Sequence, residues 1–423
     1  MVIKFSKNKF SALALLFIQI IFLYPQNNRT KKIDQNKLQL HWFNGEHLKI
    51  TKRNLNKKDS NLQPALKKLL EEADTALTQG PFSVMDKKSV PPSGDKHDYT
   101  SLSPYWWPDT TKADSLPYIR RDGIVNPERE AYDKIPGYLM AKNSFTLALA
   151  YFYTEDTRYA KHAATLLKTW FIDDSTRMNP NFNYAQFVPG KHDGRSFGII
   201  ESRNFCKAME AVILIQQSEY WNNNDTRAIK IWAQDFMDWL RNSTLGKEEA
   251  RNENNHGSWY DFQVAYFALF TDNIKIAKSI LERVPERRIE TQIKSDGKQP
   301  HELERTRAYF YSTFNLEALY AVASLAEELE IDIWNYSSNG KPDLQKALDF
   351  LVSYIGREKE WPYQQIHGWH KAYENLFQLL RKSAIAYNKQ KYEDLINKLP
   401  IKHKAESRIN LLYPEPNLIL NNN

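Results

Sequence analysis

Cysteine is almost absent from this chain of 423 residues. The single cysteine, Cys206, excludes an internal disulfide and a cysteine-based metal cluster. Because Cys206 lies in an apolar, helix-like run, we expect a buried thiol. Metal-ligand spacing is also lacking among the histidines, apart from His367 and His370, and Gly368 and Trp369 between these two favour a loop. We therefore expect no metal site.

A dense cluster of one charge sign is lacking as well. The chain has 58 Lys and Arg against 51 Asp and Glu, a net charge of +7, and these residues are spread along its length. Because the chain has no basic cluster and no recognisable nucleic-acid-binding motif, we expect no nucleic-acid partner. The moderate positive excess suits an anionic partner without identifying it.

Long hydrophobic runs are lacking beyond the N-terminus. Three lysines precede the apolar stretch 10–24, and Pro25 ends it, which is the layout of a secretory signal. At about fifteen residues this stretch is short for a membrane span, which takes ~20. No small-x-small pair marks a cleavage site, so a retained anchor is the alternative to a signal peptide. We expect residues 1–26 to direct secretion to the periplasm. Once this signal segment is removed, we expect no stable insertion of the mature protein into a membrane.

Strand-like alternation is scarce, whereas helical periodicity recurs. In residues 62–79, apolar side chains return with a period near 3.6 residues. Without a sheet between them, such helices must pack on one another. Similar patterns occupy residues 137–153, 157–171, 202–218, 224–243, 258–270, 273–284, 307–329, 343–355, 372–387 and 392–399.

Consecutive helices are expected to form hairpins. Hairpins stack as an open solenoid or close into a toroid, and the lack of a fixed repeat weakens the solenoid. The long loops 80–133 and 179–201 favour the toroid, because loops longer than about 15 residues inside a compact domain usually carry function. We predict an all-α fold, an (α/α) toroid or incomplete barrel over residues 62–400, with an N-terminal extension over 27–61 and a C-terminal tail over 401–423.

Aromatic residues are abundant, with 11 Trp, 23 Tyr and 21 Phe. In the loop 98–109, Tyr105, Trp106 and Trp107 stand between two prolines that disfavour regular structure. Three consecutive large rings cannot all be buried in one core. At least one is therefore expected to be exposed and to form a platform for a hydrated ligand with a flat face, such as a sugar. The alternative is a loop pinned by its own rings.

A second segment joins Asn254, Asn255 and His256 directly before Gly257 and a helical run. One Asn is explained as a helix N-cap. Two Asn and a His at a helix start, where backbone N–H groups already favour an anion, form a convergent donor set for a carboxylate. Tyr260, on the helix that follows, is a further substrate-binding candidate.

A third segment runs from the Asp296–Gly297 turn into a helix with two arginines and two tyrosines. Arg307 and Tyr311, like Arg305 and Tyr309, are four residues apart and share a helix face. An arginine beside a tyrosine favours the phenolate and lowers the pKa of the phenol, which suits a base. The alternative is surface arginines and core tyrosines on an ordinary helix.

These segments together suit one reaction. In a 4-linked uronic acid the C5 proton is adjacent to the C6 carboxylate, and its removal gives a dianionic intermediate that needs electrostatic stabilisation. Asn, His and Arg neutralise the carboxylate, and Tyr takes the C5 proton. The same or another Tyr then donates to the departing O4. This chemistry requires no metal, nucleotide or redox cofactor.

With these residues the chain resembles the alginate-lyase-domain superfamily of helical polysaccharide lyases. The resemblance covers roughly residues 80–380 and is specific as a combination rather than in any one motif. It is carried by Asn254-Asn255-His256, by the stretch Asp296-Gly297-Lys298-Gln299-Pro300-His301-Glu302-Leu303-Glu304-Arg305 leading to Tyr311, by the loop 103–109 and by residues 198–203.

The resemblance implies a toroid with a central groove. It further implies that Asn255 and His256 neutralise the substrate carboxylate and that Tyr311 is base and acid. His256 is the alternative base, depending on the epimer that is cut. An arginine about two turns before the tyrosine is expected to join them, and both Arg305 and Arg307 are eligible.

The resemblance also implies that Arg203 binds a neighbouring carboxylate. The implied partner is an anionic polysaccharide such as alginate, glucuronan or another uronan, cleaved by β-elimination. The sequence does not indicate the oligomeric state.

Two rival functions are weighed against this one. A glycoside hydrolase would use two carboxylates, but no pair is evident among Asp109, Glu201, Asp261 and Glu304, and the Asn-Asn-His segment would have no role. A non-catalytic polyanion-binding protein of the cell envelope would not need Tyr311.

Overall fold

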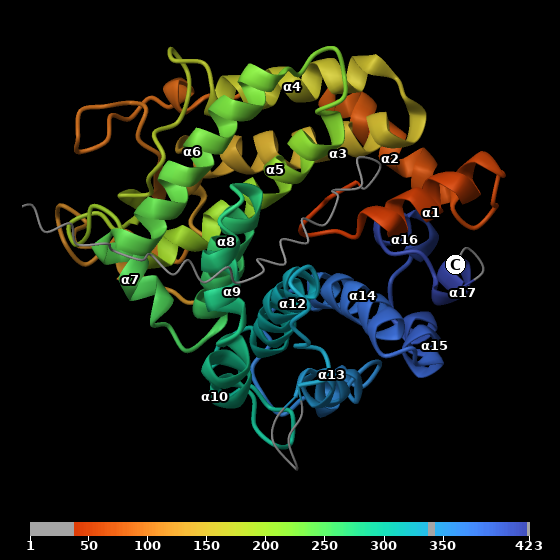
Figure 1. Cartoon of the computed structure of the whole chain (residues 1–423). Coiled ribbons are helices and arrows are strands. Elements are labelled where there is room, and N and C mark those ends of the chain that lie inside the picture. The colour runs from red at the N-terminus through yellow and green to blue at the C-terminus, as the bar shows by residue number, and fades with distance from the viewer. Residues whose placement is uncertain (1–37, 337–342, 421–423) are drawn as a thin grey trace, which may run out of the picture. The chain divides into compact units, whose positions relative to one another are not determined.

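Helices provide nearly all regular structure in the computed structural model, which describes residues 38–336 and 343–420 (Figure 1). The predicted signal segment 1–26 lies outside the described residues. Residues from Leu38 onward form one compact unit. No helix in the described part is long and apolar enough to span a membrane.

Five long helices form the inner layer, and each packs beside the next. α3 packs on α5, α5 on α8, α8 on α12, and α12 on α14. In α8 and α12, buried residues lie on all sides, as expected for helices enclosed by others. The inner helices are α3 Lys134–Thr154, α5 Arg203–Ile215, α8 Asn255–Phe270, α12 Ala308–Glu327 and α14 Trp369–Ala386.

Amphipathic helices form an outer layer against these. α2 and α4 pack on α3, α6 and α9 on α8, α13 on α12, and α15 on α14. Each hairpin therefore pairs an inner with an outer helix, and the predicted all-α toroid is confirmed. The outer helices are α2 Gln63–Ala76, α4 Thr157–Phe171, α6 Asn223–Asn242, α9 Ile274–Leu281, α13 Leu344–Val352 and α15 Gln390–Lys398.

The helical periodicity located these elements to within a few residues, and the predicted helix 157–171 coincides with α4. Cys206 is buried in α5, as predicted. Shorter helices escaped the sequence prediction because they span too few turns to show a period. They are α7 Thr244–Ala250, α10 Glu290–Gln292, α11 Pro300–Leu303, α16 Ile409–Leu412 and α17 Pro416–Leu420. The longer α1, Gly45–Asn56, was also not predicted; it lies in the stretch expected to be an N-terminal extension.

Short strands tie the two long loops together. β1 (Thr100–Leu102), in the first loop, pairs in parallel with β4 (Tyr184–Phe187), in the second. Within the first loop, β2 (Trp106–Trp107) pairs in antiparallel fashion with β3 (Ile119–Arg120). The loops are therefore held against each other at one end of the inner helices.

The described parts of the predicted extension and tail pack on the same core. Trp42 and Phe43 stack on each other, and Phe43 stacks on Phe145 of α3. α1 contacts α16 and α17, and α16 contacts α2 (Figure 1). Both ends of the described chain thus complete the helical assembly beside α3.

A buried carboxylate fixes the N-terminal segment to this core. Glu210 of α5 is fully buried and accepts backbone N–H groups of His41 and Trp42, at 3.0 and 3.2 Å, and the hydroxyl of Tyr266, at 2.7 Å. These donors lie in segments far apart in the sequence, so Glu210 joins the N-terminal segment, α5 and α8.

Replacing Glu210 by Ala is expected to leave these donors unpaired. We expect the free energy of unfolding, measured by urea denaturation, to fall by about 3 kcal/mol or more, because hydrogen bonds to a buried charge are lost. Tyr266→Phe removes one of them and should cost about 1 kcal/mol. Equal losses for the two variants would contradict this role of Glu210.

Candidate active site

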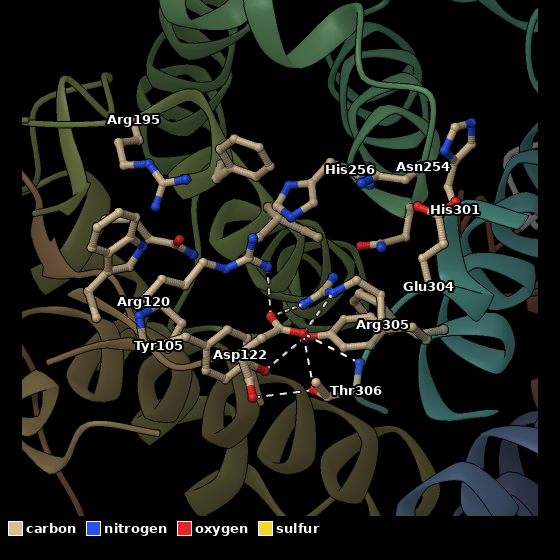
Figure 2. Close-up of a pocket in the computed structure, with 18 of the residues that line it drawn as sticks. Tyr105, Arg120, Asp122, Arg195, Asn254, His256, His301, Glu304, Arg305 and Thr306 are labelled. Carbon is tan, nitrogen blue, oxygen red and sulfur yellow. Dashed lines mark hydrogen bonds and ion pairs between the residues drawn. The ribbon is translucent and has the colours of Figure 1, made fainter. Parts of the chain in front are cut away.

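A cavity of about 720 Å³ opens where the two long loops meet the ends of α5, α8 and α12. Figure 2 shows it, with Arg195 and His301 at opposite sides and the Asp122–Arg305 pair between them. The predicted residues that line it are Tyr105, Trp106, Arg203, Asn254, Asn255, His256, Arg305 and Tyr311. The structure therefore brings most of the predicted site into one cavity.

The start of α8 presents the Asn-Asn-His segment to this cavity. Asn254 is the N-cap, and its side chain accepts the N–H of His256 at 3.1 Å. Asn255, fully buried, donates its backbone N–H and its Nδ2–H to the carboxylate of Glu302, at 2.6 and 2.8 Å. Its Oδ1 has no hydrogen-bond partner among the described residues. Glu302 therefore orients Asn255.

A close backbone approach explains the glycine that follows. A Cβ on Gly257 would lie 2.0 Å from the carbonyl oxygen of Asn252 and 2.3 Å from the Arg288 guanidinium. Arg288 is buried, pairs with Asp261 at 2.6 Å and donates to the carbonyl oxygens of Asn252 and Ala250. The turn before α8 is thus fixed from beneath the site.

A second buried carboxylate orients the imidazole. The Nδ1 of His256 lies 2.6 Å from Oε1 of Glu249, whose side chain is fully buried. Asn252 donates to the other oxygen of Glu249 at 2.7 Å. Because the contact with Glu249 occupies Nδ1, Nε2 is the ring nitrogen that remains for a ligand.

Arg305 lies against Tyr311, a different pairing from the predicted one. The predicted continuous helix is interrupted: α11 ends at Leu303 and α12 begins at Ala308. In this break the guanidinium of Arg305 lies over the Tyr311 ring, 3.8 Å from its centroid. The predicted shared faces of Arg305 with Tyr309 and of Arg307 with Tyr311 were therefore wrong.

Asp122 of the first long loop holds Arg305 in that position. Arg305 donates Nη2–H and Nε–H to the carboxylate of Asp122 at 2.9 and 3.2 Å, and Thr306 donates its hydroxyl at 3.0 Å. Burial alone would raise the pKa of Asp122, but Arg305 and then Arg120 lower it below its usual range. Asp122 is therefore an anion that anchors the loop to the break before α12.

The phenol of Tyr311 is protonated in the free protein. Burial, reinforced by the neighbouring Tyr105, raises the pKa of Tyr311 above its usual value, and the charge of Arg305 opposes the rise only in part. The predicted net lowering of this pKa was wrong, because burial outweighs the arginine. The hydroxyls of Tyr311 and Tyr105 are 2.8 Å apart and share a hydrogen bond.

The three consecutive rings of the first loop have different surroundings. Tyr105 contacts Tyr311, and Trp106 lines the cavity with the Arg195 guanidinium 5.5 Å from its ring centroid. Trp107 does not line the cavity: its Nε1–H donates to the carbonyl oxygen of Ile124 at 2.9 Å. The ligand platform expected of this loop is thus limited to its first two rings.

Tyr260 and Arg307 also lie outside the cavity, contrary to the sequence prediction. Tyr260 is buried, and its hydroxyl donates to the carbonyl oxygen of Leu240. It therefore packs α8 against α6. The guanidinium of Arg307 lies over Phe310, 4.2 Å from the ring centroid. Of the two eligible arginines, Arg305 lines the cavity and Arg307 does not.

Arg203 lies at the start of α5, in the cavity wall. Its Nη1–H donates to the carbonyl oxygen of Ile200 at 2.8 Å, and its guanidinium lies 5.1 Å from the Phe314 ring centroid. Burial lowers the pKa of Arg203 from its usual value, and Glu317 opposes this shift. No carboxylate within the described residues forms an ion pair with it, so it can bind an anion.

Sequence reasoning missed several residues of the site. Glu249 and Glu302 contact His256 and Asn255 from behind. Glu302 belongs to the 296–305 motif, but the sequence does not show that either glutamate pairs with these residues. The two long loops were the available signal, since both contribute charged residues to the cavity. The unpredicted lining residues are Pro104, Arg120, Asp122, Lys134, Gln186, Arg195, Phe197, Ile200, His301, Glu304, Thr306 and Phe314.

Of the four carboxylates considered for a hydrolase, only Glu304 lines the cavity. Asp261 pairs with Arg288, and Glu201 is buried with Lys134 at 2.6 Å. Asp109 accepts from Thr111 within its own loop. No group of His, Cys, Asp and Glu side chains in the described part of the chain is arranged to hold a metal ion.

Comparisons with known proteins relate the chain to alginate lyases. An alginate lyase from Bacteroides ovatus is 39% identical, with a TM-score of 0.86 over 89% of this chain and 99% of that chain. Alginate lyase A1-III from Sphingomonas species A1 is 16% identical, with a TM-score of 0.59 over 90% of this chain and 97% of that one, and so supports the fold alone. A histidine-to-alanine variant of A1-III complexed with a tetrasaccharide gives 16% identity and a TM-score of 0.56 over the same shares.

No curated protein matches the chain. The sequence model described as alginate lyase matches residues 83–361, more than half of the chain. With the structural likeness to the Bacteroides ovatus enzyme, this match shows that the chain belongs to the alginate lyase family and is a polysaccharide lyase.

Proposed function

We propose that this protein cleaves a 4-linked uronic-acid polymer, alginate or glucuronan, by β-elimination. The observation that carries the proposal is that one cavity is lined by an amide, an imidazole, a guanidinium and a phenol, those of Asn255, His256, Arg305 and Tyr311. These groups supply the charge neutralisation and proton transfer that β-elimination needs. Membership of the alginate lyase family supports the same reaction.

Carboxylate neutralisation is assigned to the start of α8. Backbone N–H groups and the helix dipole favour negative charge there. Asn255 has one amide hydrogen committed to Glu302, and its other hydrogen remains for the substrate. Glu249 holds Nδ1 of His256, so Nε2 is the ring nitrogen that can donate to the substrate carboxylate when the imidazole carries both protons. Both stabilise the charge that develops when C5 loses its proton.

Proton transfer is assigned to Tyr311. It accepts the C5 proton as a phenolate, the C5–H electron pair forms the C4=C5 bond, and the C4–O4 bond breaks. The same proton then passes to O4, so the phenolate is restored. The raised pKa means that the phenol must first lose its own proton, and the Tyr105 hydroxyl at 2.8 Å gives that proton a route. Arg305, stacked on the ring, favours the phenolate.

His256 is the alternative base for an epimer whose C5 proton points to the opposite face of the sugar. Its Nε2 serves this role when the imidazole is neutral. Further along the cavity, Arg203, Trp106 and Asn254 are proposed to hold neighbouring sugar units.

Export fits this activity. A polymer of charged sugars does not cross a membrane, so an enzyme that acts on it must meet it outside the cytoplasm. We propose that residues 1–26 direct secretion, with the periplasm as the destination.

The first test is a screen of the purified protein against polymannuronate, polyguluronate, glucuronan and glycosaminoglycans. We expect ultraviolet absorbance from the new double bond with at least one of the first three. Reducing ends released without this absorbance would indicate hydrolysis, and the absence of any cleavage would remove the support for a uronan substrate.

Tyr311→Phe is expected to lower kcat by about 10²–10⁴-fold, because the group that moves the proton is lost. Affinity for the polymer, measured by titration calorimetry, should change little. Tyr309→Phe is the matched control on the same helix, since the Tyr309 hydroxyl donates to the carbonyl oxygen of Leu351 outside the cavity. A Tyr311→Phe enzyme with normal kcat would exclude the proposed role.

Arg305→Lys is expected to lower kcat/KM by roughly 10–100-fold, because lysine keeps the charge but loses the paired hydrogen bonds to Asp122 and the planar contact with Tyr311. Arg307→Lys is its control two residues away and should retain activity. If Arg307→Lys proves the more damaging change, the assignment of Arg305 is wrong.

A further inference from the structure

A second, smaller cavity lies along the same inner helices. On α5, Arg203 lines the active-site cavity, and Lys207, one turn further, lines the second; on α12, Phe314 and Glu317 are related in the same way. The second cavity has a volume of about 110 Å³. Since roughly 10–15 Å³ on this measure holds one water, it has room for several waters or for part of a sugar.

Lys207 and Glu317 are half-buried charged groups in the wall of the second cavity. Several charged groups elsewhere have an ion-pair partner within the protein, as Arg288 has Asp261 and Lys134 has Glu201. Within residues 38–336 and 343–420, Lys207 Nζ has no hydrogen bond or ion pair and lies 5.0 Å from the Trp42 ring centroid. Glu317 also lacks a hydrogen-bonding partner there, although its charge acts on Lys207.

An unpaired acid and an unpaired base that line one cavity indicate an absent ligand. Partial burial of a charged group without a partner costs free energy, and a ligand of complementary charge in the cavity would offset that cost. Burial lowers the pKa of Lys207 to about 8, and Glu317 opposes the shift. Lys207 therefore remains largely cationic at neutral pH.

The other walls suit a sugar. Trp42, Phe43 and Phe145 provide an aromatic side, and Gln378 of α14 adds an amide. Tyr138 of α3, whose exposed fraction is 46%, also lines the cavity, so a ligand has access from solvent. Aromatic rings beside polar groups are the usual surroundings of a carbohydrate.

We propose that this second cavity binds the carboxylate end of one sugar-acid unit, with Lys207 holding the carboxylate and Gln378 accepting from a hydroxyl. The site takes no part in bond cleavage. The choice of a sugar acid rests on the proposed function, whereas the existence of an anion site at Lys207 does not. The site would hold a product or a chain end beside the reacting site.

The test is titration calorimetry of D-glucuronate with the full-length protein, in a His256→Ala background that removes one of the two side chains assigned to carboxylate binding in the active-site cavity. Adding Lys207→Met should weaken the affinity roughly tenfold or more, because a hydrogen bond between charged groups is lost. At mildly acidic pH, where Lys207 stays cationic in both proteins, adding Glu317→Gln should tighten the affinity, because a repelling carboxylate is removed. D-glucose, which lacks the carboxylate, should bind far more weakly.

Lys161→Met is the matched control, since Lys161 is an exposed lysine of α4 away from both cavities, and it should leave the affinity unchanged. The opposite effects expected at Lys207 and Glu317 separate loss of a site from general unfolding, which would weaken binding in both variants. No detectable glucuronate binding, equal affinity with and without Lys207, or weaker binding in Glu317→Gln would overturn the proposal.

This outcome is independent of catalysis. If no uronan is cleaved but binding depends on Lys207, the proposed function fails and the second site stands. If uronans are cleaved but glucuronate binding does not depend on Lys207, the proposed function stands and the proposed second site is wrong.

Discussion

The site depends on the pairing of Glu302 with the start of α8. The N–H groups at a helix start have no partner within the helix, and a buried start must find one elsewhere. Glu302 supplies it by accepting both the backbone and side-chain N–H of Asn255. Because Glu302 stands three residues before Arg305, the same contact fixes the distance between the segment that carries Asn255 and His256 and the segment that carries Arg305 and Tyr311. Burial raises the pKa of Glu302, and the hydrogen bonds from Asn255 oppose part of this rise because they favour the carboxylate form.

The two long loops contribute the residues that position Arg305 and complete the cavity wall. The helical layer can present Tyr311 and His256, but it does not by itself hold an arginine over the phenol. Asp122 does this from the first loop, and β1–β4 pairing holds that loop against the second, which contributes Arg195. The cavity therefore carries Arg120, Arg195, Arg203 and Arg305 against Asp122 and Glu304, an excess of positive charge suited to an anionic polymer.

Charge pairing also distinguishes the parts of the interior. Carboxylates such as Glu210 and Asp261 have their partners within the protein and join segments distant in sequence. Arg203 and Lys207, on adjacent turns of α5, have no carboxylate partner in the described chain, and each lines a cavity. Charged side chains that join segments of the fold thus lie on the same helices as charged side chains that line cavities. The first kind has a partner within the protein, whereas Arg203 and Lys207 have no carboxylate partner among the described residues.

The sequence by itself determined the helices, the all-α class and the chemical character of the site. A period of 3.6 residues indicates the buried face of a helix, and the Asn254–His256 and Asp296–Arg305 motifs are each contiguous in the chain. The helices and the motifs can therefore be recognised from the sequence. Only the tertiary structure decided which arginine contacts Tyr311 and whether the pKa of Tyr311 is raised or lowered. It also decided that Trp107, Tyr260 and Arg307 lie outside the cavity. These depend on the break before α12, on burial and on contacts with Asp122, Glu249 and Glu302. Desolvation and pairing between residues distant in the chain have no local sequence pattern, because they arise only when the segments are packed together.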